Sequence, residues 1–358
     1  MTDGAVLAQN IEPPVETQVL NRLQSVCEAK GMQQLAVAIS DLAGFVAGDL
    51  VEVEMVLSRL GAADDLVQKS ARHLLSLEGK RLRPVCVALA ARAGSGFDER
   101  ARELAVSVEL VHSATLLHDD VVDQGTVRRG EPTARLLYGN AASVFAGDWL
   151  LIEALRRVRK AGVDRVLDEL LETIDTMIVA ESLQLEHRGR LMADREVYFS
   201  VIDGKTASLF KWAMQAGARA GGLPEPAVRA LEDYGRHLGL AFQIVDDTLD
   251  LAGDADQTGK ALFIDLEEGK VTYPILLALE RDPSLRPWLQ RAANEGRVDA
   301  DIAGRVAETL KKTGAIEETT ALATTHVDRA IELLSTLPPS AARDALEVVA
   351  RAALSRKA

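Results

Sequence analysis

The apolar residues of this chain recur at the spacing of α-helices. The segment Trp149–Val158 (WLLIEALRRV) and the later positions Leu170, Ile174 and Ile178 place apolar side chains every three or four residues. No proline interrupts residues 133–223, which suits long helices because an interior proline costs about 3 kcal/mol. Alternating runs of β-branched residues, which would indicate strands, are missing. The pattern therefore predicts an all-α protein.

Turn-forming residues divide this helical pattern without marking a linker between domains. Glycine, proline and polar residues gather at 94–96, 129–132, 221–226, 253–259 and 337–340. Residues 1–18 contain Gly4, Pro13 and Pro14 and show no clear apolar period, so we expect a flexible N-terminal tail there. We expect residues 19–358 to form a single large all-helical domain.

The composition is that of a folded protein, and it also bears on which partners the protein binds and where in the cell we expect it. Of 358 residues, 47% are apolar and 27% charged, which excludes a disordered or fibrous chain. The net charge of −13 opposes general affinity for nucleic acid or anionic lipid. The longest uncharged run, 136–147, has 12 residues against the roughly 18 of a spanning helix, so we expect no membrane insertion. With no secretory signal and only Cys27 and Cys86, we expect a cytoplasmic protein without disulfides.

Two aspartate clusters are the strongest chemical signal in the sequence. Both have the pattern Asp-Asp-x-x-Asp between apolar residues: Asp119, Asp120 and Asp123, then Asp246, Asp247 and Asp250. On a helix, the first and last aspartate of each set lie about 40° apart. Carboxylates crowded in apolar surroundings need a cation, and hard oxygen ligands suit Mg²⁺ completed by water and substrate phosphate. A solvated helix face is the competing interpretation, which the apolar flanks weaken.

Basic residues in short motifs could bind a phosphate-bearing ligand. They lie in GKRLRP, QGTVRRG and DGKTA and after the second cluster, at Lys80, Arg81, Arg83, Arg128, Arg129, Lys205, Lys260 and Lys270. Each alone is typical of a surface charge. Together with two acidic helices, they predict a site that holds a polyphosphate through metal ions and guanidinium forks.

With these motifs in view, the chain resembles the trans-prenyl diphosphate synthases of the polyprenyl synthetase family. The matching blocks are GKRLRP, HSATLLHDDVVDQGTVRRG, GKTASLF, FQIVDDTLD and GKALFIDLEEGKVTYP, which run from Gly79 to Pro274. The resemblance implies a helical bundle of the isoprenoid synthase type with a central active-site cavity. It also implies head-to-tail condensation of isopentenyl diphosphate with an allylic prenyl diphosphate, through a carbocation and with two or three Mg²⁺ ions. A homodimer is implied by the family alone.

The resemblance also assigns roles to individual residues. The metal ligands would be Asp119, Asp123 and Asp246, and the catalytic set also holds Asp120, Asp247, Asp250 and Lys205. The allylic diphosphate would contact Lys205, Arg128, Thr206 and Gln243. Isopentenyl diphosphate would lie in a metal-free basic pocket of Lys80, Arg83, His112 and Arg129, although a core histidine is the alternative for His112. Arg81, Lys260 and Lys270 complete the substrate-binding set.

Product length is a finer expectation. Side chains one turn before Asp119 would form the floor of the channel for the growing prenyl tail, and short-product members tend to carry an aromatic there. This chain has Ala114 and Thr115, and the surrounding segments look most like long-chain members such as octaprenyl diphosphate synthases. We therefore expect a long all-trans polyprenyl diphosphate. The alternative is a farnesyl or geranylgeranyl product, with Ala114 small for helix packing and Phe145 or Trp149 closing the channel.

Three other classes fit the sequence less well. A terpene cyclase would share the fold and the first cluster, but an Asn/Ser/Glu motif would replace the second. A di-iron carboxylate bundle needs two Glu-x-x-His pairs, and Glu109-x-x-His112 is the only one. A non-catalytic subunit of a heteromeric synthase would tolerate loss of aspartates, and none is lost. The sequence therefore favours an active prenyltransferase.

Overall fold

The first part of the chain folds into helices joined by short turns. This computed structural model describes residues 24, 25, 27, 28, 32–77, 79, 81–191, 194–252 and 262–355. The elements up to residue 187 are α2 (Gln33–Leu57), α3 (Leu66–Ser76), α4 (Leu82–Arg92), α5 (Glu99–Val122), β1 (Val127–Arg128), β2 (Glu131–Pro132), α6 (Ala134–Tyr138), α7 (Asn140–Ala161) and α8 (Val166–His187). The apolar periods at 149–158 and 170–178 lie in α7 and α8, as predicted.

The remaining elements are also helical. They are α9 (Arg195–Ile202), η2 (Asp203–Ala207), α10 (Ser208–Ala220), α11 (Glu225–Ala252), α13 (Ile264–Glu267), α14 (Tyr273–Arg281), η3 (Pro283–Leu285), α15 (Arg286–Glu295), α16 (Ala300–Thr313), α17 (Ala315–Leu333), η4 (Leu334–Thr336) and α18 (Ala341–Leu354). The all-α prediction is confirmed. The predicted breaks at 94–96 and 337–340 fall between helices. Of the predicted break at 221–226, residues 221–224 separate α10 from α11 and residues 225–226 begin α11, whereas 253–259 lies outside the described residues.

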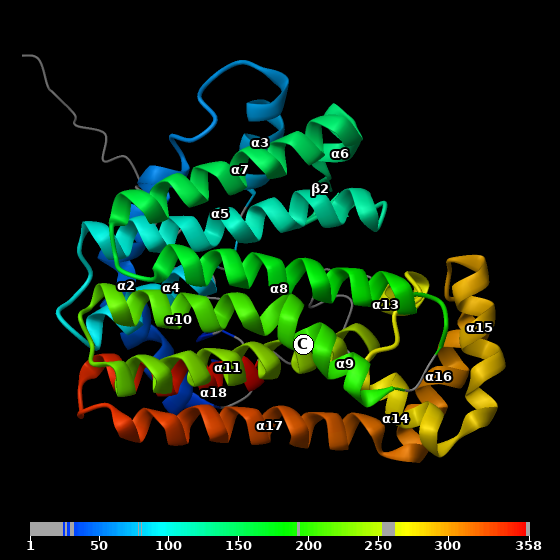
Figure 1. Cartoon of the computed structure of the whole chain (residues 1–358). Helices are drawn as coiled ribbons and strands as arrows, with labels where there is room; N and C mark the ends of the chain where they lie inside the picture. Colours follow the sequence, from blue (N-terminus) through cyan, green and yellow to red (C-terminus); the bar gives the residue numbers. More distant parts are fainter. Residues whose placement is uncertain are drawn as a thin grey trace, which may run out of the picture.

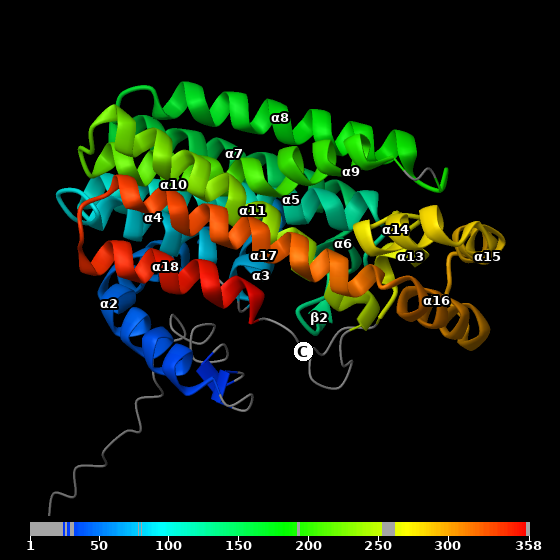
Figure 2. The same ribbon diagram turned by 90° about the horizontal axis from the view of Figure 1, so that it is seen from below.

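The long helices lie side by side and place both aspartate clusters toward one end of the bundle. Helix α5 packs against α7 and α4, α10 packs against α4 and α11, and α11 packs against α17. Figure 1 shows the axes of these helices roughly aligned, with α13 to α16 gathered at one end of the bundle. In the view from below, α8 lies along one edge and α2 and α18 lie toward the other (Figure 2). The largest buried side chains, Trp212, Phe210 and Tyr234, fill the interior at α10 and α11.

Side-chain caps fix where several of these helices begin. Asp98 accepts a hydrogen bond from the Ala101 backbone N–H at the start of α5, and Asp194 caps α9 in the same way. Ser340 caps α18. Such caps contribute about 0.5–2 kcal/mol each because they satisfy backbone donors that the helix leaves free. The cap at Asp98 therefore helps to set the start of the helix that carries the first aspartate cluster.

Helices α9 and α10 form one continuous helix that contains a π-helical turn, η2 (Asp203–Ala207). Gly239 on α11 faces this turn closely. A Cβ atom at Gly239 would lie 2.6 Å from the Ala207 Cα. Turns of this kind interrupt the regular helical hydrogen bonds and occur frequently at functional sites. The glycine therefore allows α11 to approach the turn that carries the GKTA motif.

Two further expectations can be compared with the structure, and a third cannot. The turn-forming residues at 129–132 belong to a short hairpin: residues 129 and 130 form its turn, and its two antiparallel strands pair Val127 with Pro132 and Arg128 with Glu131. Within the described residues, no helix is long and apolar enough to cross a membrane. The proposed tail, 1–18, lies outside the described residues, so its boundary remains a prediction.

Candidate active site

The first two aspartates of the first cluster lie near the end of α5, and each faces a cation. The Oδ2 atom of Asp119 lies 3.6 Å from the Nζ atom of Lys205. Asp120 is 2% exposed, and its Oδ1 atom lies 2.8 and 2.7 Å from the Nε and Nη2 atoms of Arg128. Burial raises the pKa of Asp119, and the nearby positive charge of Lys205 opposes this shift.

Asp123, the third aspartate, directly follows α5 and has two cationic partners. Its Oδ1 atom accepts a hydrogen bond from Nη1 of Arg188 at 3.0 Å, and its Oδ2 atom accepts one from Nζ of Lys270 at 3.1 Å. Lys270 also contacts the Glu268 carboxylate. Each carboxylate of the first cluster is therefore neutralised by a cation from a different part of the chain.

The second cluster lies near the end of α11 and has one deeply buried member. Asp247 is 3% exposed and accepts hydrogen bonds from the Tyr198 hydroxyl at 2.7 Å and from Nε2 of Gln243 at 2.8 Å. Burial raises the pKa of Asp247, and the negative charge of Asp265 adds to the shift. Asp250 accepts a hydrogen bond from the Ile264 backbone N–H and so fixes the start of α13.

The middle aspartate of each cluster is thus the buried one. Asp120 is held by Arg128, and Asp247 is held by Tyr198 and Gln243. Burial raises the pKa of Tyr198 well above its usual range, so its hydroxyl keeps the proton that it donates to Asp247. Both middle carboxylates are therefore placed to orient their neighbours, whereas Asp119 and Asp123 retain partial exposure.

The π turn connects the two clusters through consecutive residues. Lys205 reaches Asp119, and it also contacts the Glu181 carboxylate and donates to Gln184 Oε1 at 3.0 Å. Thr206 donates a hydrogen bond from Oγ1 to Gln243 Oε1 at 2.8 Å. The GKTA motif therefore binds α5 and α8 on one side and α11 on the other.

A second polar group, made of Arg83 at the start of α4 and His112 on α5, lies about two helical turns before Asp119. The guanidinium of the half-buried Arg83 stacks on Phe210, with 4.5 Å between Cζ and the ring centroid, and its buried Nε atom has no hydrogen-bond partner. Burial lowers the pKa of His112 well below 6.5, and the positive charges of Arg83 and Arg129 lower it further. The imidazole is therefore neutral at pH 7 and can act as a hydrogen-bond donor or acceptor.

Arg81 differs from Arg83 because its guanidinium is already paired with protein groups. It contacts the Glu54 carboxylate on α2, lies 2.6 Å from the Glu109 carboxylate, and donates to the Leu75 carbonyl at 3.3 Å. Burial opposes its charge, but the two carboxylates outweigh burial and raise the pKa of Arg81. In this structure Arg81 joins α2, α5 and the end of α3 beside Arg83. That it also contacts the substrate stays a prediction.

Several polar residues of the site were missed by the sequence analysis. They are Glu54, Glu109 in its pairing with Arg81, Glu181, Gln184, Arg188 and Tyr198. Each is a single residue outside the quoted motifs, so only the fold brings it to the site. The predicted residues Lys80 and Lys260 lie outside the described residues.

The carboxylates fit a metal that is shared with a phosphate ligand. Within the described residues, no three carboxylate, imidazole or thiol groups converge closely enough to hold an ion alone. Mg²⁺ binds few carboxylates and completes its shell with water and substrate phosphates, so separated aspartates suit it. The buried Oδ2 atom of Asp120 and the buried Nε atom of Arg83 have no hydrogen-bond partner in the protein. Each can therefore form a hydrogen bond with a ligand.

The residues proposed to set product length lie deeper along α5. Ala114 is fully buried, and Thr115 is half-buried with its hydroxyl donating to the His112 carbonyl at 2.8 Å. Phe145 is 60% exposed on α7, so its ring points away from the bundle interior. Trp149 is half-buried and packs against the core. Of the two residues considered for closing the channel, only Trp149 faces the core, so it stays the candidate.

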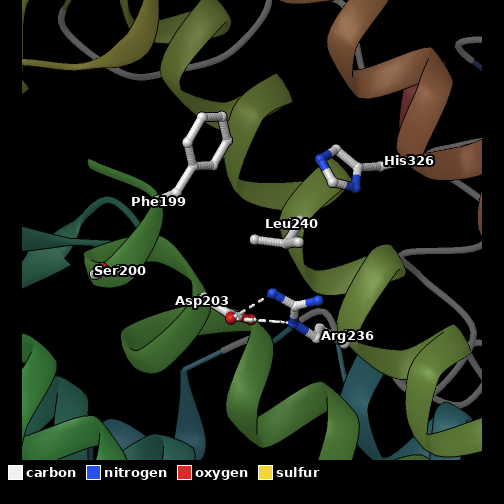
Figure 3. A pocket seen from close by; sticks show the side chains of 6 residues that line it. All are labelled: Phe199, Ser200, Asp203, Arg236, Leu240 and His326. Carbon is white, nitrogen blue, oxygen red and sulfur yellow. Dashed lines mark hydrogen bonds and ion pairs between the residues drawn. The ribbon is translucent and has the colours of Figure 1, made fainter. Parts of the chain in front are cut away.

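A separate hollow lies beside the π turn, on the face where α9, α11 and α17 meet. It has a volume of about 410 Å³ and is lined by Phe199, Ser200, Asp203, Arg236, Leu240 and His326 (Figure 3). Asp203 and Arg236 form an ion pair with 2.8 Å between Oδ2 and Nη2. The hollow includes none of the predicted site residues, so it is distinct from the aspartate site.

The class of protein follows from this combination of fold and site. Two aspartate clusters that face each other across a lysine–threonine turn inside a helical bundle define the class of isoprenoid synthases. Comparison with known proteins gives the family: the polyprenyl synthetase pattern matches residues 64–310, and the chain belongs to this family. It is therefore a prenyltransferase.

Similar proteins of this family differ in their product. The chain is 38% identical to the octaprenyl diphosphate synthase of Escherichia coli over 303 residues, which covers 84% of this chain and 93% of the relative. It is also 38% identical to heptaprenyl diphosphate synthase component 2 of Geobacillus stearothermophilus, covering 86% and 95%. A short chain isoprenyl diphosphate synthase of Methanothermobacter thermautotrophicus is 36% identical, covering 81% and 90%.

A solved structure supports the same fold. The polyprenyl synthase of Caulobacter crescentus, complexed with calcium and isoprenyl diphosphate, has a TM-score of 0.83 and 36% identity to this chain. The match covers 88% of this chain and 97% of the other. The isoprenoid synthase fold that the sequence predicted is thus confirmed.

Proposed function

We propose that this prenyltransferase condenses isopentenyl diphosphate head-to-tail with an allylic prenyl diphosphate and gives a long all-trans product. One observation carries the assignment of the site: consecutive residues Lys205 and Thr206 connect the two aspartate clusters. Beside them, Arg83, whose Nε atom is buried, and neutral His112 form a second polar group. Two neighbouring sites, one acidic and one basic, match a reaction between two diphosphates of which only one ionises.

The acidic side suits the allylic substrate. Asp119, Asp123 and Asp246 would hold Mg²⁺, in two or three ions that also contact the diphosphate. Bound Mg²⁺ would stabilise the negative charge that leaves with the diphosphate when the allylic C–O bond breaks. Lys205 and Arg128 lie at this cluster and can donate to the phosphate oxygens.

The basic side suits isopentenyl diphosphate, which keeps its diphosphate throughout. Arg83 offers a buried Nε donor without a protein partner, and His112 and Arg129 lie near it. The isopentenyl double bond attacks the allylic carbon, a C–C bond forms, and a proton leaves the new cation. The released diphosphate can accept that proton, so no dedicated protein base is required.

The long product rests on the small residues before the first cluster. Ala114 is fully buried and Thr115 is half-buried, so neither places a bulky ring below Asp119. The similar octaprenyl and heptaprenyl synthases favour a long chain, whereas the short-chain relative keeps a farnesyl or geranylgeranyl product as the alternative.

A homodimer is the second part of the proposal. Helices α7 and α8, which contact each other, expose large apolar side chains: Phe145 at 60%, Ile152 at 47%, Ile178 at 63% and Val179 at 60%. Exposed apolar side chains of this size on adjoining helices suit a protein interface. The relative described as component 2 makes a heteromer the alternative. We also propose that residues 19–358 act as one domain in the cytoplasm, where the buried thiols of Cys27 and Cys86, which form no disulfide, would stay reduced.

Labelled isopentenyl diphosphate with several allylic primers tests the proposed reaction. We expect long polyprenyl diphosphates to form with Mg²⁺ and no product after chelation by EDTA. Asp119→Asn and Asp246→Asn should each lose turnover by several orders of magnitude, because each removes a charged metal ligand. Asp175→Asn, at an exposed position on α8, is the matched control and should keep full turnover. Turnover in EDTA, or near-native turnover of either variant, would exclude the metal site.

A further inference from the structure

Arg188 is held at the first aspartate cluster, although it belongs to no motif. It follows directly after α8, and its Nη1 atom donates to Asp123 Oδ1 at 3.0 Å. Its Nε atom donates to the Glu268 carbonyl at 2.7 Å, and its side chain is 28% exposed. The guanidinium therefore bridges the end of α5 and the segment after α13, where the end of α8 also lies (Figure 1).

A backbone contact fixes the position of this arginine. The Gly189 N–H donates to the Gly269 carbonyl at 2.8 Å. Gly269 has a φ of 75°, and a Cβ atom there would lie 3.1 Å from the Gly189 nitrogen. This close approach ties the end of α8 to the segment that carries Lys270, so Arg188 and Lys270 reach Asp123 together.

The cations around the first cluster form a consistent set. Lys205 faces Asp119 and Arg128 faces Asp120, as Arg188 faces Asp123. A divalent ion that binds a carboxylate weakens the carboxylate's attraction for its former cation. That cation is then free to donate to the phosphate that arrives with the metal.

We propose that Arg188 is a diphosphate-binding residue of the allylic site, and this inference rests on the proposed function. Its Nε stays anchored on the Glu268 carbonyl while the Nη groups turn from Asp123 to a phosphate oxygen. Anchoring limits the conformational freedom lost on binding, and a guanidinium fork matches phosphate geometry. The competing role is purely structural: Arg188 would only join α5 to the segment around Glu268.

Binding of inorganic pyrophosphate, measured by calorimetry with and without Mg²⁺, separates the two roles. Arg188→Gln should weaken pyrophosphate binding in Mg²⁺ about tenfold, the loss expected for one hydrogen bond to a charged group. Arg188→Lys keeps the charge and should lose less. Arg190→Gln removes the same charge two residues away, at an exposed side chain, and should bind like the wild type.

Steady-state kinetics supply the second readout. Arg188→Gln should raise the KM for the allylic diphosphate and leave the KM for isopentenyl diphosphate within about twofold. If Arg188→Gln has a lower melting temperature but binds pyrophosphate like the wild type, the role of Arg188 is only structural and the inference fails. If the wild type itself binds no pyrophosphate in Mg²⁺, the proposed function fails as well. The two failures are thus distinguishable.

Discussion

Lys205 and Thr206 are neighbours in the chain, yet their side chains reach different aspartate clusters. Lys205 lies 3.6 Å from Asp119, while Thr206 donates to Gln243, which in turn donates to Asp247. Consecutive residues of a helix point in different directions around its axis, so one turn that packs between α8 and α11 can serve both sides. The relative position of the two clusters therefore depends on this turn.

Replacing Lys205 should damage ionisation of the allylic substrate. Lys205→Ala should lower kcat by about 10²–10³, because it removes a preorganised positive charge beside the departing diphosphate. Single-turnover rates at saturating substrate measure this loss. Lys211→Ala removes an α10 lysine that pairs with Glu232 of α11, so it is the control and should retain the rate. Similar rates in both variants would show that Lys205 does not act on the leaving group.

Replacing Arg83 should instead affect isopentenyl diphosphate. Arg83→Ala removes the buried donor whose Nε has no protein partner, so the KM for isopentenyl diphosphate should rise more than that for the allylic primer. Initial rates with each substrate varied in turn measure the two constants. Equal increases in both KM values would contradict the separation into an acidic and a basic site.

The packing of α11 on the π turn should be sensitive to one methyl group. Gly239→Ala places a Cβ 2.6 Å from the Ala207 Cα, so it should destabilise the fold by about 1–3 kcal/mol and lower activity. Gly304→Ala on α16 meets nothing within 4 Å and should stabilise by about 0.5–1 kcal/mol. Urea denaturation measures both changes. A neutral Gly239→Ala would mean that the turn adjusts freely.

The acidic and basic motifs could be predicted from sequence because their residues lie close together in the chain. Asp119 and Asp123 share one helix end, and spacing alone brings them together. Their partners could not be predicted in this way. Arg188 and Lys270 reach Asp123 from distant segments, and only the folded chain shows which cation meets which carboxylate.

The burial of individual motif residues was also beyond the sequence. A helical wheel treats Asp120 as one more carboxylate of the cluster, yet the structure buries it against Arg128. The segment that holds Arg128 contains two short paired strands. Each strand has only two residues, which is too few to produce an alternating pattern in the sequence. The π turn at Lys205 likewise leaves no mark in the apolar pattern.

The contact between α11 and α17 should make stability fall in mild acid. His237 and His326 lie with 2.9 Å between their Nδ1 atoms, beside the hollow of Figure 3. Burial lowers the pKa of His326 to about 4 and lowers that of His237, and the positive charge of Arg236 adds to both shifts. Asp203 and Asp233 oppose the shift of His237, but do not cancel it.

The sign of the pH effect follows from proton binding. Between pH 6.5 and about 4 the unfolded histidines bind protons that the folded ones do not, so the free energy of unfolding falls as the pH falls through this window. His326→Gln should flatten that part of the profile. Urea denaturation at several pH values measures the profile, and an unchanged slope in His326→Gln would contradict the prediction.

The residues before the first cluster should set the length of the product. Thr115→Phe places a ring at a half-buried position four residues before Asp119, on nearly the same side of α5 as this aspartate. Ala114→Phe adds a ring at a fully buried position and should also cost about 1–3 kcal/mol by overpacking. We expect the double variant to give short chains while the first condensation continues, because the ring blocks only the growing tail.

Sizing the products from labelled isopentenyl diphosphate checks this expectation, and the rate of the first condensation reports whether the variant remains folded and active. Trp149→Ala provides the complementary test. Trp149 packs against the core from α7, so if it closes the channel, its removal should lengthen the product. If the floor instead lies at Ala114 and Thr115, Trp149→Ala should leave product length unchanged and the double phenylalanine variant should shorten it. An unchanged length in the double variant would place the floor elsewhere.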